Sequence, residues 1–390
     1  LTMEKSYIVS AVRTAVGKSK AGSAIAHVRP DDLGAAAIRE AVKRSGVPVE
    51  RIGDCVMGCA FPEAEAGMNV GRIAQLAAGL PDTIPGETVN RFCSSGLEAM
   101  TTAALKIEVG MLDAAIAGGL ESMSVIPIGG NKTCPNPWLT KNNPRAYTGM
   151  GQCADNVARD FGITREECDA WALRSNQRAA AAIGKGLFKE EIVPLEVMGP
   201  DGKTFIFDTD EGPRADTTLE GLAKLRPAFA ASPKLGIHTA GNSSQTSCGA
   251  AAVVMVSEAV LKELGLRPLA RLRGYAVAAG DPGYLGPPQV PAILDACEQA
   301  GINVEDLGLV ECNEAFAAQT LYVVKNLNLS EDIVNVNGGA IALGHPLGCT
   351  GAKLATQLIH EMRRRGVKWG LETMCIGGGM GGAGVFELCD

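Results

Sequence analysis

The sequence predicts an α/β protein whose sheets are covered by helices on both faces. Short apolar runs alternate with segments of helical periodicity through most of the 390 residues, a pattern typical of sheets packed between helices. The chain is longer than one hydrophobic core usually organises, so we expect two or three domains. Glycine, with 48 residues, is used about twice as often as average, which indicates backbone packed closely against a ligand.

The expected elements alternate in chain order. The strand-like apolar runs are Tyr7–Val12, Asp54–Cys59, Ala114–Gly118, Ala252–Ser257, Leu269–Ala278, Leu309–Asn313, Ile333–Asn337, Leu371–Ile376 and Val385–Leu388. The segments with apolar residues at helical spacing are Pro30–Ser45, Val70–Gly79, Ser94–Val109, Arg165–Lys185, Val290–Ala300, Ala315–Leu327 and Gly351–Arg364. Both sets follow the periodicities that buried strands and helices show.

Residues 121–239 differ from the rest of the chain, with more Pro, Asn, Lys and Asp and fewer strand signals. Segments such as Asn131–Pro137 and Thr140–Pro144 are typical of loops. One clear helix begins at Thr164, with Glu167 in capping-box spacing. We interpret the segment as a large insertion between the last strands of the first α/β unit.

Two of the predicted helices begin with similar sequences, a similarity that we call the internal echo. The segments Cys93-Ser-Ser-Gly96 and Cys349-Thr-Gly351 each open an apolar helix after an Asn-containing strand. Helices that are apolar on nearly all sides are buried, so two such helices would lie together at the centre of a duplicated fold. Chance similarity between Gly- and Ala-rich segments explains the echo equally well.

Composition argues against several classes of protein. A net charge of −7 gives no basis for nucleic-acid binding, and no apolar stretch is long enough to span a membrane. The first strand-like run begins at Tyr7 with no secretory signal before it, so the twelve scattered cysteines indicate reduced thiols in a cytoplasmic protein. With four histidines and no Cys-x-x-Cys pair we expect no metal site. Two of these histidines, His27 and His360, lie in polar stretches that we expect to be exposed.

Cys93 is the strongest candidate for a catalytic residue. It follows a short strand-like stretch and opens the helix-like run Leu97–Val109. The unpaired N–H groups and the dipole of a helix N-terminus favour thiolate over thiol, as a nucleophilic cysteine requires. A lone cysteine is more often a buried structural residue. Here, however, two Gly-rich segments, 338–351 and 374–384, carry further candidate groups.

The candidate partners of this nucleophile are few. His345, in a Gly-flanked turn before a helix, is the best candidate base, with a merely packed histidine as the alternative. Asn313 and Cys375 each end an apolar strand, where α/β proteins place their ligands. The glycines after Cys375, Gly377 among them, leave backbone N–H groups free to donate to a developing negative charge.

Four segments together resemble the signature blocks of thiolases. They are Val89-Asn-Arg-Phe-Cys-Ser-Ser-Gly96, Asn313-Glu-Ala-Phe-Ala317, Gly338-Gly-Ala-Ile-Ala-Leu-Gly-His-Pro-Leu-Gly348 and Cys375-Ile-Gly-Gly-Gly-Met-Gly381. Their order and spacing match those of the family, and the likeness extends from Ser10-Ala-Val-Arg-Thr14 to the last strand. Four long blocks in order are far more specific than a lone short motif.

The resemblance implies a thiolase fold, an α/β/α/β/α arrangement of five layers built from two similar halves with an inserted loop domain. The N-terminal half would comprise residues 1–120 and 240–266, the CoA-binding loop domain residues 121–239, and the C-terminal half residues 267–390. Thiolases are typically dimers or tetramers of dimers, so we expect a homodimer or homotetramer. Whether a partner subunit of a β-oxidation complex exists stays open.

The implied reaction is ping-pong cleavage of a 3-ketoacyl-CoA by CoA, giving acetyl-CoA and a shortened acyl-CoA. CoA is then a substrate, and no cofactor is bound permanently. The resemblance makes Cys93 the nucleophile that carries the acyl group, His345 the base that activates it, and Cys375 a second acid/base. Asn313, through a bound water, and His345 would form one oxyanion site, and the backbone N–H groups of Cys93 and Gly377 the other.

The residues that the resemblance places on CoA lie in or beside the loop domain. They are Met150, Ala315, Phe316, Ala240 and Ser244 along the pantetheine, and Arg214 and Phe229 near the nucleotide. Arg214, Lys224 and Arg226 could form a basic patch for the phosphates, although a solvated surface explains them equally well.

Three positions depart from common thiolase patterns. Gly149, before Met150, stands where short-chain biosynthetic thiolases usually have His, Cys248 where many members have Asp, and Gly221 where Ser is frequent. The glycine at position 149 favours a degradative 3-ketoacyl-CoA thiolase of broad chain length. The acyl group itself is not predicted, although Arg145 and Tyr147 would favour a polar or aromatic one.

Other functions stay open at this point. An acetoacetyl-CoA thiolase (acetyl-CoA C-acetyltransferase) working in the condensing direction would use the same residues. Ketoacyl-carrier-protein synthases and hydroxymethylglutaryl-CoA synthases lack a catalytic Cys near the C-terminus, so the segment of Cys375 argues against them. A non-catalytic acyl-CoA-binding subunit would be expected to lose a catalytic group, whereas Cys93, Asn313, His345 and Cys375 are all present.

Overall fold

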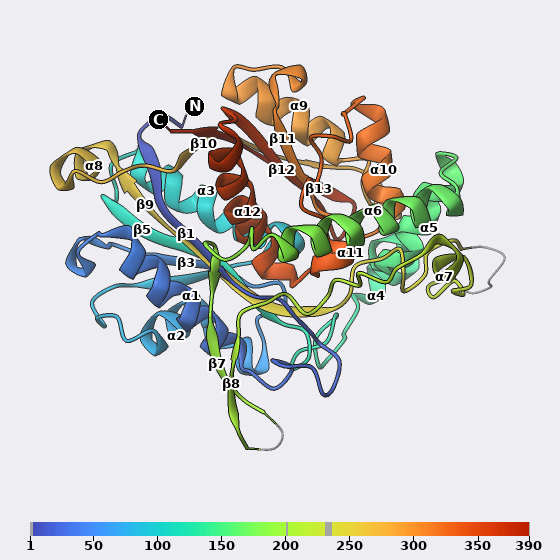
Figure 1. Cartoon of the computed structure of the whole chain (residues 1–390), viewed down its shortest axis with the longest axis horizontal. Coiled ribbons are helices and arrows are strands. Elements are labelled where there is room, and N and C mark those ends of the chain that lie inside the picture. The colour runs from blue at the N-terminus through green and yellow to red at the C-terminus, as the bar shows by residue number, and fades with distance from the viewer. Residues whose placement is uncertain (1–2, 200–201, 231–235, 390) are drawn as a thin grey trace.

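The computed structural model describes residues 3–199, 202–230 and 236–389, and its main sheet consists of two half-sheets that meet edge to edge (Figure 1). The N-terminal half-sheet has the strand order β4-β3-β5-β9-β1, and the C-terminal half-sheet has the order β11-β12-β13-β10. One antiparallel pair, Ile8 with Ala270, joins β1 to β10. The predicted domain ranges also contain residues 1–2, 200–201, 231–235 and 390, which lie outside the described residues.

The strands match most of the predicted runs: five are longer than predicted, and those at 55–58 and 309–312 are shorter. The N-terminal half-sheet contains β1 (Ser6–Thr14), β3 (Cys55–Gly58), β4 (Gly86–Val89), β5 (Ala114–Ser122) and β9 (Ser247–Ser257), with the short β2 (Gly17–Lys18) on β9 and β6 (Ile192–Val193) on β1. The C-terminal half-sheet contains β10 (Ala270–Ala279), β11 (Leu309–Cys312), β12 (Trp369–Ile376) and β13 (Met380–Leu388). A separate ribbon of β7 (Leu195–Met198) and β8 (Thr204–Phe207) projects from the body (Figure 1).

The seven predicted helices are found to within a few residues of their expected bounds, whereas the helices at 137–142, 150–160, 219–223, 258–264 and 340–343 were not predicted. The helices of the two halves are α1 (Pro30–Ser45), α2 (Val70–Ala77), α3 (Ser95–Glu108), α8 (Glu258–Leu264), α9 (Gln289–Ala300), α10 (Ala317–Asn326), α11 (Ala340–Leu343) and α12 (Thr350–Arg365). Those of the segment 121–239 are α4 (Pro137–Asn142), α5 (Met150–Asp160), α6 (Arg165–Gly184) and α7 (Leu219–Ala223). The predicted capping box of Thr164 and Glu167 at the start of α6 is confirmed.

Side chains of each strand alternate between two cores, which explains why the strands read as continuous apolar runs. In β9, Ala252, Val254 and Val256 belong to the outer core with α1 and α2. Their neighbours Val253 and Met255 belong to the central core, which contains α3 and α12. A third core packs α9 and α10 against β11, β12 and β13. Within the described part of the chain, the layers therefore run α/β/α/β/α, as predicted.

The two half-sheets repeat one topology. The order β3-β5-β9-β1 in the first corresponds to β11-β12-β13-β10 in the second. The strand predicted at Ile333–Asn337, which would have corresponded to β4, is wrong: Val334 forms only an isolated parallel bridge with Val310. Asn335 has a φ of 46°, and its side chain bonds both the N–H and the C=O of Cys312 at 2.8 Å. The side chain of Asn335 therefore makes the hydrogen bonds to Cys312 that the backbone of a paired strand would make.

The two central helices cross with their backbones in contact, at the glycines of the internal echo. A Cβ atom on Gly96 of α3 would lie 2.5 Å from the backbone N of Ala352, and one on Gly351 of α12 would lie 2.3 Å from that of Leu97. Only glycine permits so close an approach. The crossing brings the N-termini of α3 and α12 together and therefore places the segments of Cys93 and His345 side by side.

Glu372 on β12 is a buried carboxyl group without a hydrogen-bond partner on either oxygen. Burial, reinforced by Glu311 on the neighbouring strand, raises its pKa well above the ordinary value. Since the folded protein holds this proton more tightly than the unfolded chain, stability falls as pH rises from the unfolded pKa through the folded one. We expect Glu372→Gln to stabilise the protein by about 1–3 kcal/mol near neutral pH. Thermal unfolding at neutral and at acidic pH checks this, and an equal gain at both would contradict it.

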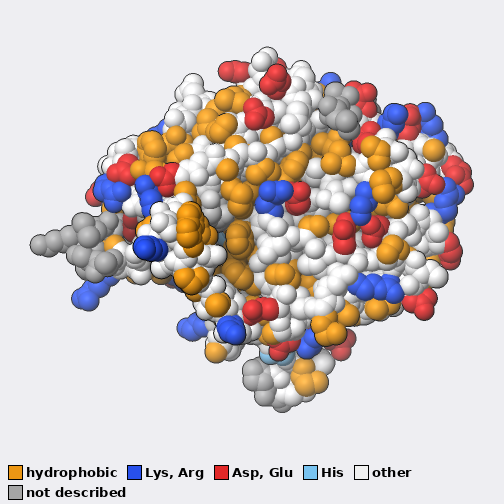
Figure 2. All heavy atoms as spheres, turned by 180° about the vertical axis from the view of Figure 1, so that it is seen from behind, with side chains coloured by type: hydrophobic (Ala, Val, Ile, Leu, Met, Phe, Trp, Pro, Cys, Tyr) orange, Lys and Arg blue, Asp and Glu red, His pale blue; other side chains and the backbone are white. Residues whose placement is uncertain are grey.

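The surface shows no dominant charge. Figure 2 shows Lys and Arg side chains scattered among Asp and Glu side chains on the face opposite to that of Figure 1. Among the helices in the described ranges, none combines the length and the apolar character that crossing a membrane requires.

Candidate active site

Cys93 lies between β4 and α3, in the 3₁₀ turn Phe92–Ser94. The preceding residue, Phe92, has a φ of 45°, in the left-handed region that residues other than glycine rarely adopt. Strained backbone of this kind is often found at functional sites. The thiol is buried, with 9% of Cys93 exposed, so it faces the interior between the two halves.

The thiol of Cys93 is protonated in the unliganded protein. Burial raises its pKa to about 12, although the backbone N–H groups of Cys93 and Gly377 act in the opposite direction. The N–H groups at the helix N-terminus thus favour thiolate as expected, but desolvation outweighs them in this state. Since both N–H groups interact with the sulfur, they also lie near any acyl group bonded to it.

His345 is placed as a base for Cys93. Its Nε2 lies 3.2 Å from the Sγ of Cys93, and its Nδ1 lies 2.6 Å from the hydroxyl oxygen of Thr350. That hydroxyl donates its proton to the carbonyl of Pro346 at 2.9 Å, so it accepts one from Nδ1. The lone pair of the imidazole is consequently on Nε2 and faces the thiol. Burial, with a contribution from Lys353, lowers the pKa of His345 to about 3, which keeps the imidazole neutral.

Thr350 is a functional residue that the sequence prediction missed. It is the first residue of α12, and its hydroxyl fixes both the ring orientation and the tautomer of His345. The segment Cys349-Thr-Gly351 was noted only as an echo of the Cys93 segment. A hydroxyl one helical turn after a candidate base is the signal that could have identified it.

Asn313 lies beside the same imidazole. Its Nδ2 is 3.3 Å from the Nε2 of His345, and its Oδ1 is buried without a hydrogen-bond partner. The next residue, Glu314, fixes this strand end by accepting hydrogen bonds from Trp171 at 2.9 Å and Ser175 at 2.6 Å. The free acceptor on Asn313 fits a bound water or a donor on a ligand.

Cys375 is the second thiol of the site. It lies near the end of β12, is 1% exposed, and packs with Met150, Ala315 and Phe316. Burial raises its pKa well above the ordinary value, and Cys93 adds to the shift. The site thus holds two protonated thiols, and a proton lost by either one makes loss of the other harder.

A pocket adjoins this centre on the side of the loop domain. It is lined by Asn176, Gly212, Arg214, Thr217, Leu222, Ala240, Gly241, Ser243, Gln245 and Ile341. Of the residues predicted on CoA, Arg214 and Ala240 are in this lining. The Oδ1 of Asn176, which the sequence prediction missed, accepts a hydrogen bond from the backbone of Arg214 at 2.9 Å and so fixes one wall.

The other residues predicted on CoA contact one another or Cys375. The backbone N–H of Ser244 donates to the carbonyl of Ala315 at 2.9 Å. The rings of Phe229 and Phe316 meet edge to face, with centroids 5.4 Å apart. Met150 packs in the same cluster as Cys375, Ala315 and Phe316. Of the seven predicted residues, Arg214 and Ala240 thus line the pocket, whereas Met150, Ala315 and Phe316 pack with Cys375.

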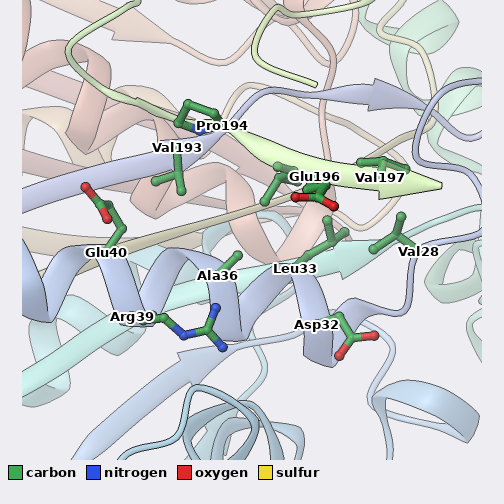
Figure 3. Close-up of a pocket in the computed structure, with 11 residues that line it drawn as sticks. Val28, Asp32, Leu33, Ala36, Arg39, Glu40, Val193, Pro194, Glu196 and Val197 are labelled. Carbon is green, nitrogen blue, oxygen red and sulfur yellow. The ribbon is translucent and has the colours of Figure 1, made fainter. Parts of the chain in front are cut away.

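A separate groove lies between α1 and the strands β6 and β7 (Figure 3). Its floor is apolar, and its charged side chains are Asp32, Arg39, Glu40 and Glu196. Among its described lining residues there is no thiol, hydroxyl or imidazole, and none belongs to the predicted site. The groove therefore offers no thiol, hydroxyl or imidazole nucleophile.

Comparison with known proteins agrees with this geometry. Models for the thiolase N-terminal and C-terminal domains match residues 6–259 and 266–388. A Bacillus subtilis (strain 168) protein named 3-ketoacyl-CoA thiolase is 52% identical over 395 residues, covering 99% of this chain and 100% of the relative. A Chromobacterium violaceum protein named acetyl-CoA acetyltransferase is 46% identical over 386 residues, covering 96% and 97%. The crystal structure of the Bacillus anthracis acetyl-CoA acetyltransferase has a TM-score of 0.90 and 41% identity, with 100% of both chains covered. The chain belongs to the thiolase family.

Proposed function

We propose that the chain is a 3-ketoacyl-CoA thiolase, an acyltransferase that cleaves a 3-ketoacyl-CoA with CoA into acetyl-CoA and a shortened acyl-CoA. The observation that carries the proposal is the buried Cys93 thiol at 3.2 Å from the Nε2 of His345. A second buried thiol, Cys375, lies close enough for Cys93 to affect its pKa. The Bacillus subtilis relative of that name, 52% identical, supports the choice of substrate.

In the first half-reaction, Cys93 attacks the 3-keto carbon while His345 takes the proton from its sulfur. The bond between the second and third carbons then breaks, and its electron pair leaves on the second carbon as an enolate. The thiol of Cys375 protonates that carbon, and acetyl-CoA departs. The acyl group stays on Cys93 as a thioester. The neutral pair of thiol and imidazole suits this sequence because the proton moves only as the sulfur attacks.

In the second half-reaction, an incoming CoA thiol gives its proton to the Cys375 thiolate and attacks the acyl-cysteine. The sulfur of Cys93 leaves and recovers its proton from the imidazolium of His345. Shortened acyl-CoA is released, and both cysteines return to the thiol form. Each proton and electron pair is accounted for by these three side chains.

In this proposal, negative charge is stabilised at two sites, one for the oxygen of the acyl group and one for the oxygen of the enolate. The N–H groups of Cys93 and Gly377 donate hydrogen bonds to the oxygen of the acyl group on Cys93. Both groups lower the pKa of the Cys93 sulfur, and this effect supports the role. The thioester oxygen of the enolate lies toward His345 and a water held by the free Oδ1 of Asn313. Loss of one such donor lowers kcat by about 10²- to 10³-fold in other enzymes.

CoA enters from the pocket of Arg214 and Ala240 in the same proposal. Its pantetheine passes Ser244 and the cluster of Met150, Ala315 and Phe316, and Phe229 lies toward the nucleotide. Ser243 of the pocket lining forms an isolated bridge with Phe316, which packs with Cys375, and this connection supports the path. CoA is a substrate here, and the proposed reaction requires no permanently bound cofactor.

The predicted domain division, oligomeric state and location stay predictions. We propose the halves 1–120 with 240–266 and 267–390, and the loop domain 121–239, because the repeated strand order separates the two halves. A homodimer or homotetramer in the cytoplasm is expected from the family alone.

Thr350→Val is expected to lower kcat by about 10- to 100-fold, because the buried Nδ1–H of His345 loses its acceptor. Without that acceptor the tautomer with the proton on Nε2 becomes more favourable, and that tautomer cannot accept the Cys93 proton. Thr350→Ser keeps the hydroxyl and is expected to restore most of kcat. Steady-state kinetics with both variants check this. Equal kcat in the Val variant and the unsubstituted protein would show that the hydroxyl does not position the base.

Thiolysis of 3-ketoacyl-CoA substrates of increasing chain length, followed by loss of Mg-enolate absorbance, tests the proposed function. Turnover of medium or long chains supports it. Turnover of acetoacetyl-CoA alone would assign the chain to acetyl-CoA acetyltransferases, the name that two of its relatives carry. Turnover of none would overturn the 3-ketoacyl-CoA assignment.

A further inference from the structure

Glu121, at the end of β5, has a buried carboxylate with a donor on each oxygen. It is 1% exposed, and its Oε2 accepts hydrogen bonds from the backbone N–H groups of Ala60 and Gly348, both at 2.8 Å. The thiol of Cys59 donates to Oε1 at 3.6 Å. Burial raises the pKa of Glu121, and the backbone N–H groups of Ala60, Gly348 and Phe61 and the thiol of Cys59 oppose that change. Since all of these groups donate, the contacts suit the ionised form.

The turn next to His345 is hydrogen-bonded to this carboxylate. Gly348 belongs to the short helical turn between His345 and α12, and that turn packs backbone to backbone on the ends of β3 and β5. A Cβ atom on Gly119 would lie 2.0 Å from the carbonyl oxygen of Gly348, and one on Gly348 would lie 2.6 Å from the Cα of Cys59. Because Glu121 bonds the N–H of this same glycine, it fixes the position of the turn and therefore that of the imidazole.

Glu121 also lies near the segment of the nucleophile: Ala60, whose N–H donates to this carboxylate, accepts a hydrogen bond on its carbonyl from the side chain of Asn90, three residues before Cys93, at 2.9 Å. Burial is the largest cause of the raised pKa of Cys93, and the Glu121 carboxylate adds to it. The titratable and charged groups around this region are Cys59 after β3, Cys93 before α3, His345 and Cys349 on the turn, Cys375 on β12, Lys353 on α12 and Arg13 on β1. Lys353 and Arg13 lower the pKa of Cys349, whereas the charge that acts on Cys93 is that of Glu121.

We propose that Glu121 is a positioning residue of the thiolase site: its carboxylate fixes the turn of His345 against the strand ends and sets a negative charge beside Cys93. The consequence for turnover rests on the proposed function, but the effect on Cys93 does not. The charge repels a thiolate and so keeps Cys93 protonated until substrate binds. A thiol in this form resists alkylation and oxidation between turnovers.

Two variants distinguish the hydrogen bonds by which Glu121 holds the turn, called the anchor, from the effect of its negative charge. In Glu121→Gln the amide oxygen can take the place of Oε2 and accept both N–H groups, while the amide nitrogen faces the Cys59 sulfur. This variant therefore keeps the anchor and removes the charge. Glu121→Ala removes both and leaves the N–H groups of Ala60 and Gly348 without an acceptor. Glu361→Gln, at a carboxylate of α12 that is 3% exposed and bonds Asn337 at 2.8 Å, is the matched control.

The charge is tested by the rate at which iodoacetamide alkylates Cys93 as a function of pH, followed by mass spectrometry of the Cys93 peptide. Glu121→Gln is expected to react about three- to tenfold faster near neutral pH, because each unit by which a thiol pKa falls raises its thiolate fraction about tenfold. Glu361→Gln is expected to react at the rate of the unsubstituted protein. A merely structural Glu121 would leave the pH profile of the Gln variant unchanged, and that result would overturn the proposal.

The anchor is tested by thiolysis with the same variants. Glu121→Gln is expected to keep most of kcat, while Glu121→Ala loses about 10- to 100-fold through displacement of the imidazole, with little change in KM. Full kcat in a folded Ala variant would also overturn the proposal. If the unsubstituted protein cleaves no 3-ketoacyl-CoA, the proposed function fails, and the alkylation rates still decide whether Glu121 acts on Cys93.

Discussion

Replacing Cys93 with alanine is expected to abolish thiolysis, with kcat lowered by about 10⁵-fold or more, as found when the nucleophile of other covalent enzymes is removed. Cys93 is the thiol that the base faces, since the Nε2 of His345 lies 3.2 Å from its sulfur. No covalent acyl intermediate can form without it. Steady-state thiolysis of a medium-chain 3-ketoacyl-CoA measures the loss.

The matched control for this variant is Cys297→Ala. Cys297 on α9 is also buried, at 2% exposed, but it belongs to the core of the C-terminal half and not to the site. It is expected to retain kcat. Mass spectrometry of the protein after mixing with 3-ketoacyl-CoA in the absence of free CoA is expected to find the acyl group on the Cys93 peptide. An acyl group on Cys375 instead would refute the assignment of the nucleophile.

Local signals predicted the helices well, because each signal acts within a few residues. For α1, Pro30 occupies the first turn, Asp31 and Asp32 follow it, and Gly46 ends the helix with a φ of 70°. For α6, the capping box of Thr164 and Glu167 fixes the start. Such features depend little on the rest of the fold, so the sequence is sufficient to place them.

The strands were harder, because pairing extends them beyond their own propensity. β5 was predicted to end at Gly118 but continues to Ser122, and β9 begins at Ser247 instead of Ala252. The added residues are mostly small or polar and favour strands weakly. They are strands because β5 and β9 pair with each other along that whole stretch. Glu121 lies in the missed part of β5, so its role was invisible in the sequence.

The motifs predicted residues that the structure brings together, but they did not predict the ionisation of those residues. Position at a helix N-terminus suggested a thiolate at Cys93, yet burial by the second half of the chain raises its pKa to about 12. His360 was expected to be exposed; it is 9% exposed, and its Nε2 bonds the carbonyl of Ala11 at 3.1 Å. Both differences from expectation have one cause, since desolvation depends on the packing of elements that are distant in sequence.

Replacing Cys375 with alanine is expected to separate the two kinds of chemistry at this site. Cleavage of the carbon–carbon bond needs a proton for the enolate carbon, and we propose that it comes from the thiol of Cys375, whose pKa is raised well above the ordinary value. Thiolysis is therefore expected to fall by about 10²- to 10⁴-fold, as for other general acids. Transfer of an acyl group from a simple acyl-CoA to Cys93 breaks no carbon–carbon bond, and the CoA sulfur leaves readily, so this step is expected to persist.

Two measurements on the Cys375→Ala variant together test whether Cys375 moves the proton at the enolate carbon. The first is acetylation of Cys93 by acetyl-CoA, read as a mass increase of its peptide, which is expected to continue. The second is exchange of the acetyl-CoA methyl protons with deuterated water, which requires a group that removes and returns a proton at that carbon and is expected to stop. A variant that exchanges these protons as fast as the unsubstituted protein would show that another group moves the proton. Because Cys93 and His345 remain in this variant, loss of exchange with acetylation intact can arise only from the missing thiol, and not from a damaged nucleophile.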